Sequence, residues 1–567
     1  MVACNKDAKN DAPGTAKPGV AAPQALTVPA ILKSVPADTP YIFANFEPMP
    51  KPVLDKIFAK LAPIMDELSA SVDAELAKTT GDDVGAKVGR ALLEEVKGHM
   101  SQKGIEELGL STTPHLAVYG IGLLPAMRLE LKDPALFKAL IGRVETKAGQ
   151  KMPTAKLGDV DYWLVEAGEG FFAVAIQGNE LVVGVGPSKA KDAYLPLLLG
   201  TTKPAATLAD GGALLKIVTD YKFAPTGAGY VDVKAIAKIL MGDATGPAAD
   251  IYKAMAEAAP VLSPDCKGEI AGLVDLAPRI VFGYEEMNET SMVADFVVET
   301  KAEIGKDLTT LRAPVPGLTN KVVGNPVFAF GLGLDVEKTV AWLKSKAGAV
   351  QAAPYKCEML GALNQGAGNL VAGLNSPMPP FVSMVKGFNV TVKDAKLGQG
   401  MGPMGGIDDA KAYLTISATN PSELLGAVKL MLPPALGALT VNPDGKAVAL
   451  PDGILPPFIK TPAITMTSNA IGLSAGDGMQ AELGTVLSGP PSQDLPLLVI
   501  GYNLGKVMAA MNEKLQTTLA ALPPDQQAKV QGDMKRSAAI AQLIGYVAFS
   551  VNMSERGVVL QERVNWN

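Results

Sequence analysis

The side chains best suited to acid–base or metal chemistry are the two histidines, His99 and His115. Neither has a second histidine, cysteine or carboxylate at a metal-ligand spacing such as H-E-x-x-H, so we interpret both as surface or strand-start residues with a local partner. The chain also lacks a G-x-S-x-G elbow, a phosphate-binding glycine loop and a D-x-D-x-D-G calcium loop. These absences predict no catalytic triad at an elbow, no nucleotide site, no metal and no cofactor.

Ser188 and Lys191, in the stretch GPSKAK, have the Ser-x-x-Lys spacing of penicillin-recognising enzymes, where the lysine activates the serine. Those enzymes also need an S-D-N-like element and a K-T-G strand, and this chain offers only KTP at 460–462. The proline there removes a strand hydrogen-bond donor. The simpler interpretation is that Ser188 caps the N-terminus of a helix, while a serine hydrolase built on Ser188 and Lys191 or on a scattered triad is the alternative function.

Cys4 precedes a run rich in Ala, Pro, Gly, Lys and Asp that cannot bury enough apolar surface to fold. The preceding Val2 and Ala3 resemble the end of a bacterial lipobox, where a signal peptide is cut and the cysteine is acylated, although Met1 stands in place of the usual leucine. We expect Cys4 to be a lipidated anchor on a tether. Asn5 rather than aspartate follows, which in the enteric pattern implies the outer membrane. The alternative is a chance thiol at the terminus.

Cys266 and Cys357 are the other two cysteines of the chain. In an oxidising envelope compartment such a pair can persist as a disulfide, and closing so long a loop stabilises by about 4 to 5 kcal/mol in the chain-entropy model. Two unpaired buried thiols are the alternative. Spacing does not decide between them.

Several apolar stretches rich in Gly, Met and Pro are candidates for contact with a partner or ligand. Two of them connect strands at matching places, GIGLLPAM at 120–127 and GQGMGPMGG at 398–406, and two more are NSPMPPFVSM at 375–384 and LPPFIKTP at 455–462. They would form a partner surface, a lipid-facing tip or a greasy pocket, or simply cover the protein's own core; copper binding by methionine is a more remote option. The candidate contact residues are Leu123, Leu124, Met127, Met378, Phe381, Met401, Met404 and Phe458.

Four pairs of segments recur in the same order along the chain, roughly 270 to 290 residues apart. For example, RIVFGYEEMNETSMVADFVVET from Arg279 corresponds to YVAFSVNMSERGVVLQERVNWN from Tyr546, and both have the alternation of a β-hairpin. Hairpin-like strands with helices between them predict an α+β fold. We therefore expect two tandem homologous modules, each an antiparallel sheet packed with helices, at 31–312 and 313–567 after a disordered tether at 1–30.

Composition narrows the class of protein. In 567 residues, 48% are hydrophobic and 19% charged, which is typical of a chain that folds, and the net charge of -6 disfavours nucleic-acid binding. No apolar run is long enough to cross a bilayer. The closest, at 537–553, is interpreted as a buried helix entering a strand.

The phrase VPADTPY at 35–41 resembles the opening of a group of uncharacterised bacterial envelope proteins, a domain of unknown function. The resemblance implies an envelope location and brings no activity. Together with Cys4 it leads to the expectation of a non-catalytic, membrane-anchored envelope lipoprotein that binds another envelope protein or an apolar ligand such as a lipid. We expect it in the outer membrane, facing either the periplasm or the surface.

Overall fold

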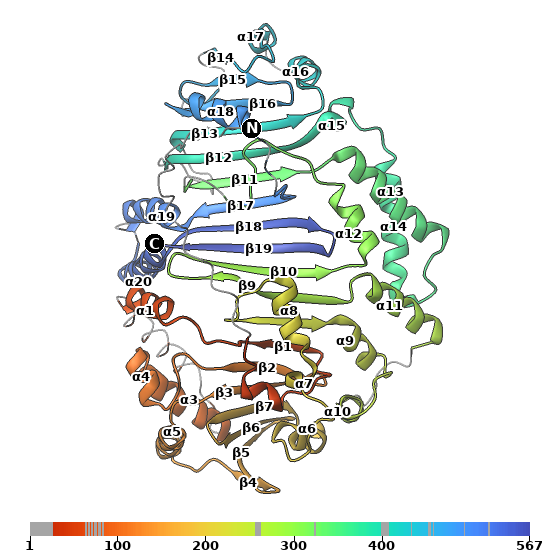
Figure 1. The fold of residues 1–567 in the computed structure, drawn as a ribbon. Coiled ribbons are helices and arrows are strands. Elements are labelled where there is room, and N and C mark those ends of the chain that lie inside the picture. The colour runs from red at the N-terminus through yellow and green to blue at the C-terminus, as the bar shows by residue number, and fades with distance from the viewer. Residues whose placement is uncertain are drawn as a thin grey trace, which may run out of the picture.

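A computed structural model of the protein describes residues 26–567 with several gaps. The gaps are residues 63, 64, 66–68, 70, 71, 73–75, 77–80, 82, 83, 256–261, 322–324, 398–406, 432, 433, 452–454, 457, 458, 491, 493, 520 and 521. Within the described part, 19 strands pair into one sheet, and every neighbouring pair is antiparallel. In Figure 1 the strands run across the view, from β14 at the top to β4 near the bottom.

The strands of the first half of the chain follow one another from the lower edge of the sheet to its middle (Figure 1). In spatial order they are β4 (Thr154–Leu157), β5 (Val160–Ala167), β6 (Gly170–Gln177), β7 (Glu180–Pro187), β3 (Leu124–Glu130), β2 (Leu116–Ile121), β1 (Tyr41–Ala44), β8 (Ala228–Asp232), β9 (Arg279–Met287) and β10 (Ser291–Glu299).

The strands of the second half continue from the middle to the upper edge. In spatial order they are β19 (Gly557–Trp566), β18 (Ile544–Ser554), β17 (Leu498–Asn503), β11 (Phe328–Gly333), β12 (Val385–Leu397), β13 (Ile407–Ala418), β16 (Ala470–Ala475), β15 (Ala463–Met466) and β14 (Ala447–Ala449). Each half thus places its closing hairpin innermost and its first strand fourth from the middle.

The two halves meet where β10 pairs with β19, from Ser291 opposite Asn565 to Glu299 opposite Gly557. Gly557 has a φ of 136°, and a Cβ there would lie 2.0 Å from the carbonyl oxygen of Val298, so only glycine allows this close approach. Open twisted sheets rarely exceed about 10 strands, and this one does so because two strand sets join edge to edge. The strands of both predicted modules therefore form a single sheet rather than two separate ones.

Helices connect the strands on both sides of the sheet. Those of the first half are α1 (Lys51–Leu61), α3 (Val84–Lys97), α4 (Gln102–Glu107), α5 (Pro134–Ala148), α6 (Lys191–Leu198), α7 (Leu208–Gly211), α8 (Ala213–Tyr221), α9 (Val233–Leu240), α10 (Pro247–Met255) and α11 (Pro264–Leu276), with short 3₁₀ turns η1 (Ala30–Ser34) and η3 (Ser188–Ala190).

The helices of the second half begin with α12 (Ala302–Thr309), which contacts β18 and β19 near the middle of the sheet. The others are α13 (Val336–Ala352), α14 (Gly361–Leu374), α15 (Pro380–Met384), α16 (Pro421–Lys429), α17 (Pro434–Gly437), α18 (Met479–Ser488), α19 (Leu504–Leu519) and α20 (Pro524–Leu543), with the 3₁₀ turn η4 (Glu358–Leu360).

Alternate residues of the strands build separate cores on the two faces of the sheet. In the first half, Val174 and Val183 face α5, whereas Ala173 and Val182 face α6 and α8. In the second half, Ile471 faces α16, and its neighbour Ala470 faces α18. Cross-strand pairing runs unbroken between these positions, so α5 and α16 cover the same face, called here the α5 face.

The local predictions from sequence agree with these elements. The apolar stretch at 537–553 is the end of α20 passing into β18, as predicted. The β9–β10 hairpin turns at MNET, where Asn288 Oδ1 accepts hydrogen bonds from the backbone N–H of Thr290 (2.8 Å) and Ser291 (2.9 Å). The large antiparallel sheet with its helices gives the chain the predicted α+β class.

Candidate functional site

An apolar pocket of about 620 Å³ lies on the α5 face near the upper end of the sheet, between α16 and the strands β12, β13 and β16. This volume is within the range of about 300–1,000 Å³ that is typical of ligand pockets. Alternating residues of the strands form its floor. They are Val390, Leu414, Ile416, Ile464, Ile471 and Leu473.

The wall opposite the floor is α16, whose start and spacing the sequence explains. Asn420 caps the helix by accepting the backbone N–H of Glu423 (3.3 Å), and Pro421 follows at the first helical position. The next apolar residues, Leu424, Leu425 and Val428, then lie on one side of the helix and face the sheet. Phe381 of α15 and five loop residues close the remaining sides, and the loop residues are Leu439, Val441, Leu450, Leu455 and Ile459.

The pocket occupies a place that is filled at the opposite end of the sheet. There α5 follows β3 just as α16 follows β13, and Asp133 caps α5 as Asn420 caps α16. However, α5 has 15 residues and buries Phe137, Leu140, Ile141 and Val144 against the strands. With only 9 residues, α16 ends before it can cover an equal area, and the strands under it stay partly open.

Lys429 is the last residue of α16 and the one charged side chain among the described residues that line the pocket. Its side chain is half-buried, and its Nζ donates a hydrogen bond to the backbone carbonyl of Leu439 across the pocket rim. The next two residues, Leu430 and Met431, are 90% and 73% exposed and point away from the core. The pocket therefore combines an apolar interior with a single cation at its edge.

The predicted contact residues are divided between the two ends of the sheet. Phe381 lines the pocket, together with Leu455, Ile459 and Pro462 of the LPPFIKTP stretch, whereas Met378 is 42% exposed outside it. Met401, Met404 and Phe458 lie outside the described residues.

The GIGLLPAM stretch packs against the protein's own core, which was one of the alternatives for it. It forms the tight β2–β3 hairpin, in which Leu124 is 6% exposed within the core, Met127 is part of β3, and Leu123 is half-buried at the turn. These residues follow the alternation of the two strands, so their apolar character serves the protein's own packing.

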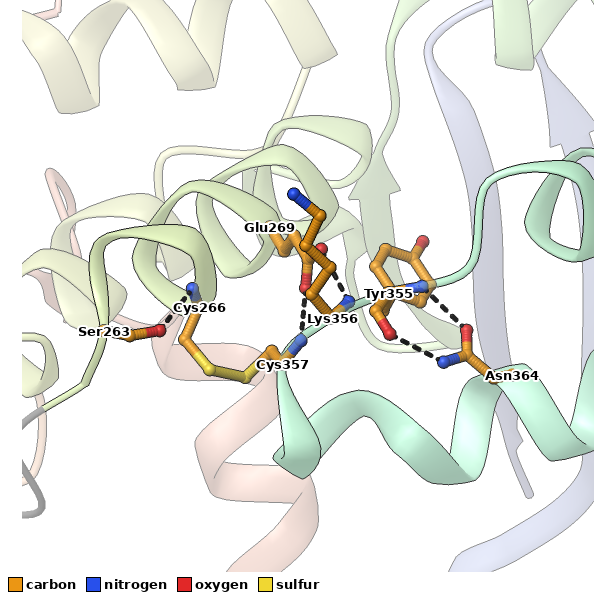
Figure 2. Close-up of a disulfide and its surroundings, with 7 residues drawn as sticks. All are labelled: Ser263, Cys266, Glu269, Tyr355, Lys356, Cys357 and Asn364. Carbon is orange, nitrogen blue, oxygen red and sulfur yellow. Dashed lines mark hydrogen bonds between the residues drawn. A yellow bond between two sulfur atoms is a disulfide. The ribbon is translucent and has the colours of Figure 1, made fainter.

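Cys266 and Cys357 form a disulfide that joins α11 to the segment between α13 and α14, with 4.6 Å between their Cα atoms (Figure 2). Glu269 accepts the backbone N–H groups of Lys356 and Cys357, both at 2.8 Å, and these hydrogen bonds hold the pKa of its carboxyl below the usual value. The bridge thus ties the two halves of the chain together. Cys4 lies outside the described residues.

Lys191 is held by a carboxylate rather than directed at a serine. Its Nζ lies 2.5 Å from Glu166 Oε1, and this hydrogen bond raises the pKa of the ammonium group. A lysine that is more firmly protonated is a poor general base. The prediction that Ser188 caps a helix is wrong. Pro187 occupies the cap position of η3, and no side chain caps that turn.

Both histidines have local partners. His115 Nδ1 lies 2.7 Å from Glu130 Oε2, and His99 Nδ1 lies 2.7 Å from the carbonyl oxygen of Glu95. Among the described residues, no three His, Cys, Asp or Glu side chains gather as a metal site would require. The described helices likewise include none with the length and apolar character of a membrane span.

Comparisons of the chain with protein families, with curated proteins and with solved structures find no match. A greasy pocket was one option for the apolar stretches, but sequence reasoning missed α16 as its wall and Lys429 at its edge. A visible signal was the segment 424–443, which is almost wholly apolar and contains one charged residue, Lys429.

Proposed function

We propose that this protein is a non-catalytic, membrane-anchored lipoprotein of the bacterial cell envelope that binds an apolar ligand such as a lipid in the α16 pocket. The observation that carries the proposal is the apolar lining of a 620 Å³ cavity. Each buried methylene group of such a ligand contributes about 0.8 kcal/mol, so one alkyl chain supplies enough free energy for specific binding. A partner protein is less favoured, since a concave pocket of this volume suits a small molecule, whereas a protein partner needs a much larger contact area.

The anchor is part of the proposal. It rests on Cys4, on the small residues before it and on the tether-like composition after it, with Asn5 favouring the outer membrane. Acylation of the cysteine would hold the folded body at a lipid surface, close to a supply of apolar ligands.

We also propose that the chain arose by duplication of one α+β module, with modules at 31–312 and 313–567. The strand orders of the two halves, read outward from β10 and β19, correspond for nine strands, with β4 as the extra strand of the first half, and this supports the duplication. So do matching helix caps: Asp232 accepts the N–H of Ala235 at the end of β8, and Asn503 accepts that of Lys506 at the end of β17. One copy then kept a filled core beneath α5, and the other opened a pocket beneath α16.

Ser188 and Lys191 carry no catalytic proposal. The short hydrogen bond from Lys191 to Glu166 occupies the lysine with a carboxylate, so the observation that would favour the hydrolase is lacking.

Val428→Phe tests the pocket, because it places a larger side chain in the cavity between α16 and the sheet. A neutral naphthylamine dye that fluoresces in apolar surroundings is titrated into the natural protein and the variant. We expect the natural protein to bind the dye and the variant to bind it at least tenfold more weakly. Leu430→Phe is the matched control, since this neighbouring side chain is 90% exposed and should leave the dye affinity unchanged.

No dye binding by the natural protein, or equal affinities of Val428→Phe and Leu430→Phe, would contradict the proposed pocket. Circular dichroism of both variants establishes that they are folded.

The lipid anchor is tested by intact mass spectrometry of protein from membrane fractions. We expect acyl groups on Cys4, and an unmodified Cys4 in these fractions would reject the anchor.

A further inference from the structure

We propose that the α16 pocket binds an anionic amphiphile with a single alkyl chain, whose carboxylate or phosphate head group pairs with Lys429. The inference rests on the proposed function and specifies the ligand class. The chain would lie between α16 and the floor strands β12, β13 and β16, and the head group would lie at the rim.

The charge of Lys429 is unbalanced within the described part of the chain. Its described partner is a neutral backbone carbonyl, that of Leu439, and no carboxylate in the described part of the chain lies within ion-pair distance. Other lysines of this region have acidic partners: Lys460 lies 3.2 Å from Asp409, and Lys446 lies 3.7 Å from Asp444. The Lys429 side chain is half-buried beside an apolar cavity, and an anionic head group would pair with its charge.

The described lining of the pocket is almost wholly apolar. Among the described residues that line the pocket, Tyr413 and Ser474 are the only polar side chains besides Lys429, and both belong to strands whose alternation turns them toward the α18 face. No described carboxylate lines the cavity to attract a cationic head group such as choline. The features left to recognise a ligand are the cation of Lys429 and the apolar lining. Together they match a molecule with one anionic end and one apolar end.

The size of the cavity suits a ligand with one alkyl chain. A water molecule takes about 30 Å³ of liquid volume, and a methylene group is similar, so a cavity of 620 Å³ has room for about twenty non-hydrogen atoms. This is the size of a long-chain fatty acid. A lipid with two long chains would exceed the cavity and leave one chain in water.

Position gives Lys429 its role at the rim. It ends α16, where the free carbonyl groups of the last turn favour a cation, and its long stem lies along apolar surface while its charge reaches the edge. Because the lysine already hydrogen-bonds a carbonyl on the opposite side of the rim, its ammonium group is held in place before a ligand arrives. Two of its three donors remain for a head group.

Displacement of the neutral dye by three competitors tests the inference. The competitors share one long alkyl chain and differ in the head group: palmitate, a lysophosphatidic acid, and hexadecanol. We expect palmitate or the lysophosphatidic acid to displace the dye at least tenfold more effectively than hexadecanol. Their relative strengths decide whether a carboxylate or a phosphate is the preferred anion.

Lys429→Met removes the charge but keeps a long apolar stem, and should reduce the preference for the anion over hexadecanol to within about threefold, well below the tenfold of the natural protein. Lys429→Arg should retain the preference. Lys446→Gln is the control for loss of one positive charge, because this residue is exposed and does not line the pocket. Equal displacement by palmitate, lysophosphatidic acid and hexadecanol, or an undiminished preference in Lys429→Met, overturns the inference.

The two proposals fail in different ways. If the dye and all three competitors fail to bind the natural protein, the pocket function is wrong, and this inference falls with it. If the natural protein binds the dye and hexadecanol displaces it as effectively as the anionic competitors do, the pocket function stands and only the assignment of Lys429 is rejected.

Discussion

At the scale of single residues, a cluster of charged and aromatic side chains supports the junction of the two halves. Arg279 donates two hydrogen bonds to Glu299, at 2.7 and 2.8 Å, and the Tyr221 hydroxyl donates to the same carboxylate. From the second half, Arg556 lies over the Tyr221 ring, 4.6 Å from its centroid, and donates to the carbonyl of Asp220. The carboxylate of Glu299 therefore binds Arg279 and Tyr221 directly, and Arg556 joins this cluster through Tyr221 and Asp220.

Glu299→Gln should destabilise the protein in a pH-dependent way. Burial raises the pKa of Glu299, but the hydrogen bonds from Arg279 and Tyr221 outweigh it and leave the pKa below the usual value. Such a carboxylate stabilises fully above its unfolded pKa of about 4.3, and this contribution is lost as pH falls through the lower folded-state value. We expect urea unfolding at pH 7 to show a loss of about 1 to 3 kcal/mol, which narrows toward pH 3.

Asp220→Asn serves as the comparison for Glu299→Gln. Asp220 pairs with Lys216 at 2.7 Å on the surface, where solvent screens the interaction. Its replacement should change stability much less. A loss for Glu299→Gln that is the same at pH 7 and pH 3 would contradict the assigned role of the carboxylate.

At the scale of elements, the difference between α5 and α16 explains why one end of the sheet is filled and the other hollow. Both helices start at a capped Asx-Pro pair and both pack on the α5 face. The longer α5 is also supported by α3, whereas α13 and α14, the helices that follow the first strand of the second half, pack mainly on each other (Figure 1). In the described part of the chain, α16 is instead supported by the short α15, so the strands beneath it are covered less completely.

Removing the two helix caps separates stability from ligand binding. Asn420→Ala and Asp133→Ala should each lower the free energy of unfolding by about 0.5 to 2 kcal/mol, because the first removes the acceptor of one backbone N–H group and the second that of two. Since α16 forms one wall of the pocket and α5 does not, only Asn420→Ala should weaken dye binding. Equal dye affinities of the two variants would show that the α16 start does not shape the pocket.

At the scale of the whole molecule, two long-range connections hold the halves together. The β10–β19 ladder makes one continuous sheet, and the Cys266–Cys357 disulfide links α11 to the segment before α14 on the side of the molecule shown at the right of Figure 1. On the opposite side, α20 contacts α1. These contacts predict that the halves unfold together, although the boundary at 312 and 313 itself stays a prediction.

Single-tryptophan variants test this cooperativity. Trp163 reports on β5 in the first half and Trp342 on α13 in the second, so one variant keeps Trp163 alone and the other keeps Trp342 alone, with phenylalanine at the other two tryptophan positions. The fluorescence midpoints in urea should coincide, because opening the seam exposes unpaired strand edges on both sides. Midpoints that differ beyond the effect of the substitutions would mean that the halves unfold independently.

The sequence by itself determined the local structure. Alternating residues and the turn at Asn288 are enough to predict the closing hairpin, and the apolar stretch at 537–553 is enough to predict a helix that passes into a strand, because these signals act over a few residues. The α+β class follows from their order. The apolar stretches around Phe381 and LPPFIKTP also contain residues that line the pocket.

Only the tertiary structure decided how these pieces combine. Whether two strand sets stay separate or share the β10–β19 ladder depends on which edge strands meet. The unpaired backbone N–H and C=O groups of an edge strand are the same in any sequence, so they do not reveal the partner strand. The burial of Leu124 and the opening beneath α16 depend on which helix covers which strands. Lys429 becomes noteworthy for the same reason: its sequence neighbours do not reveal that its charge lies at the rim of an apolar cavity with only a carbonyl as partner.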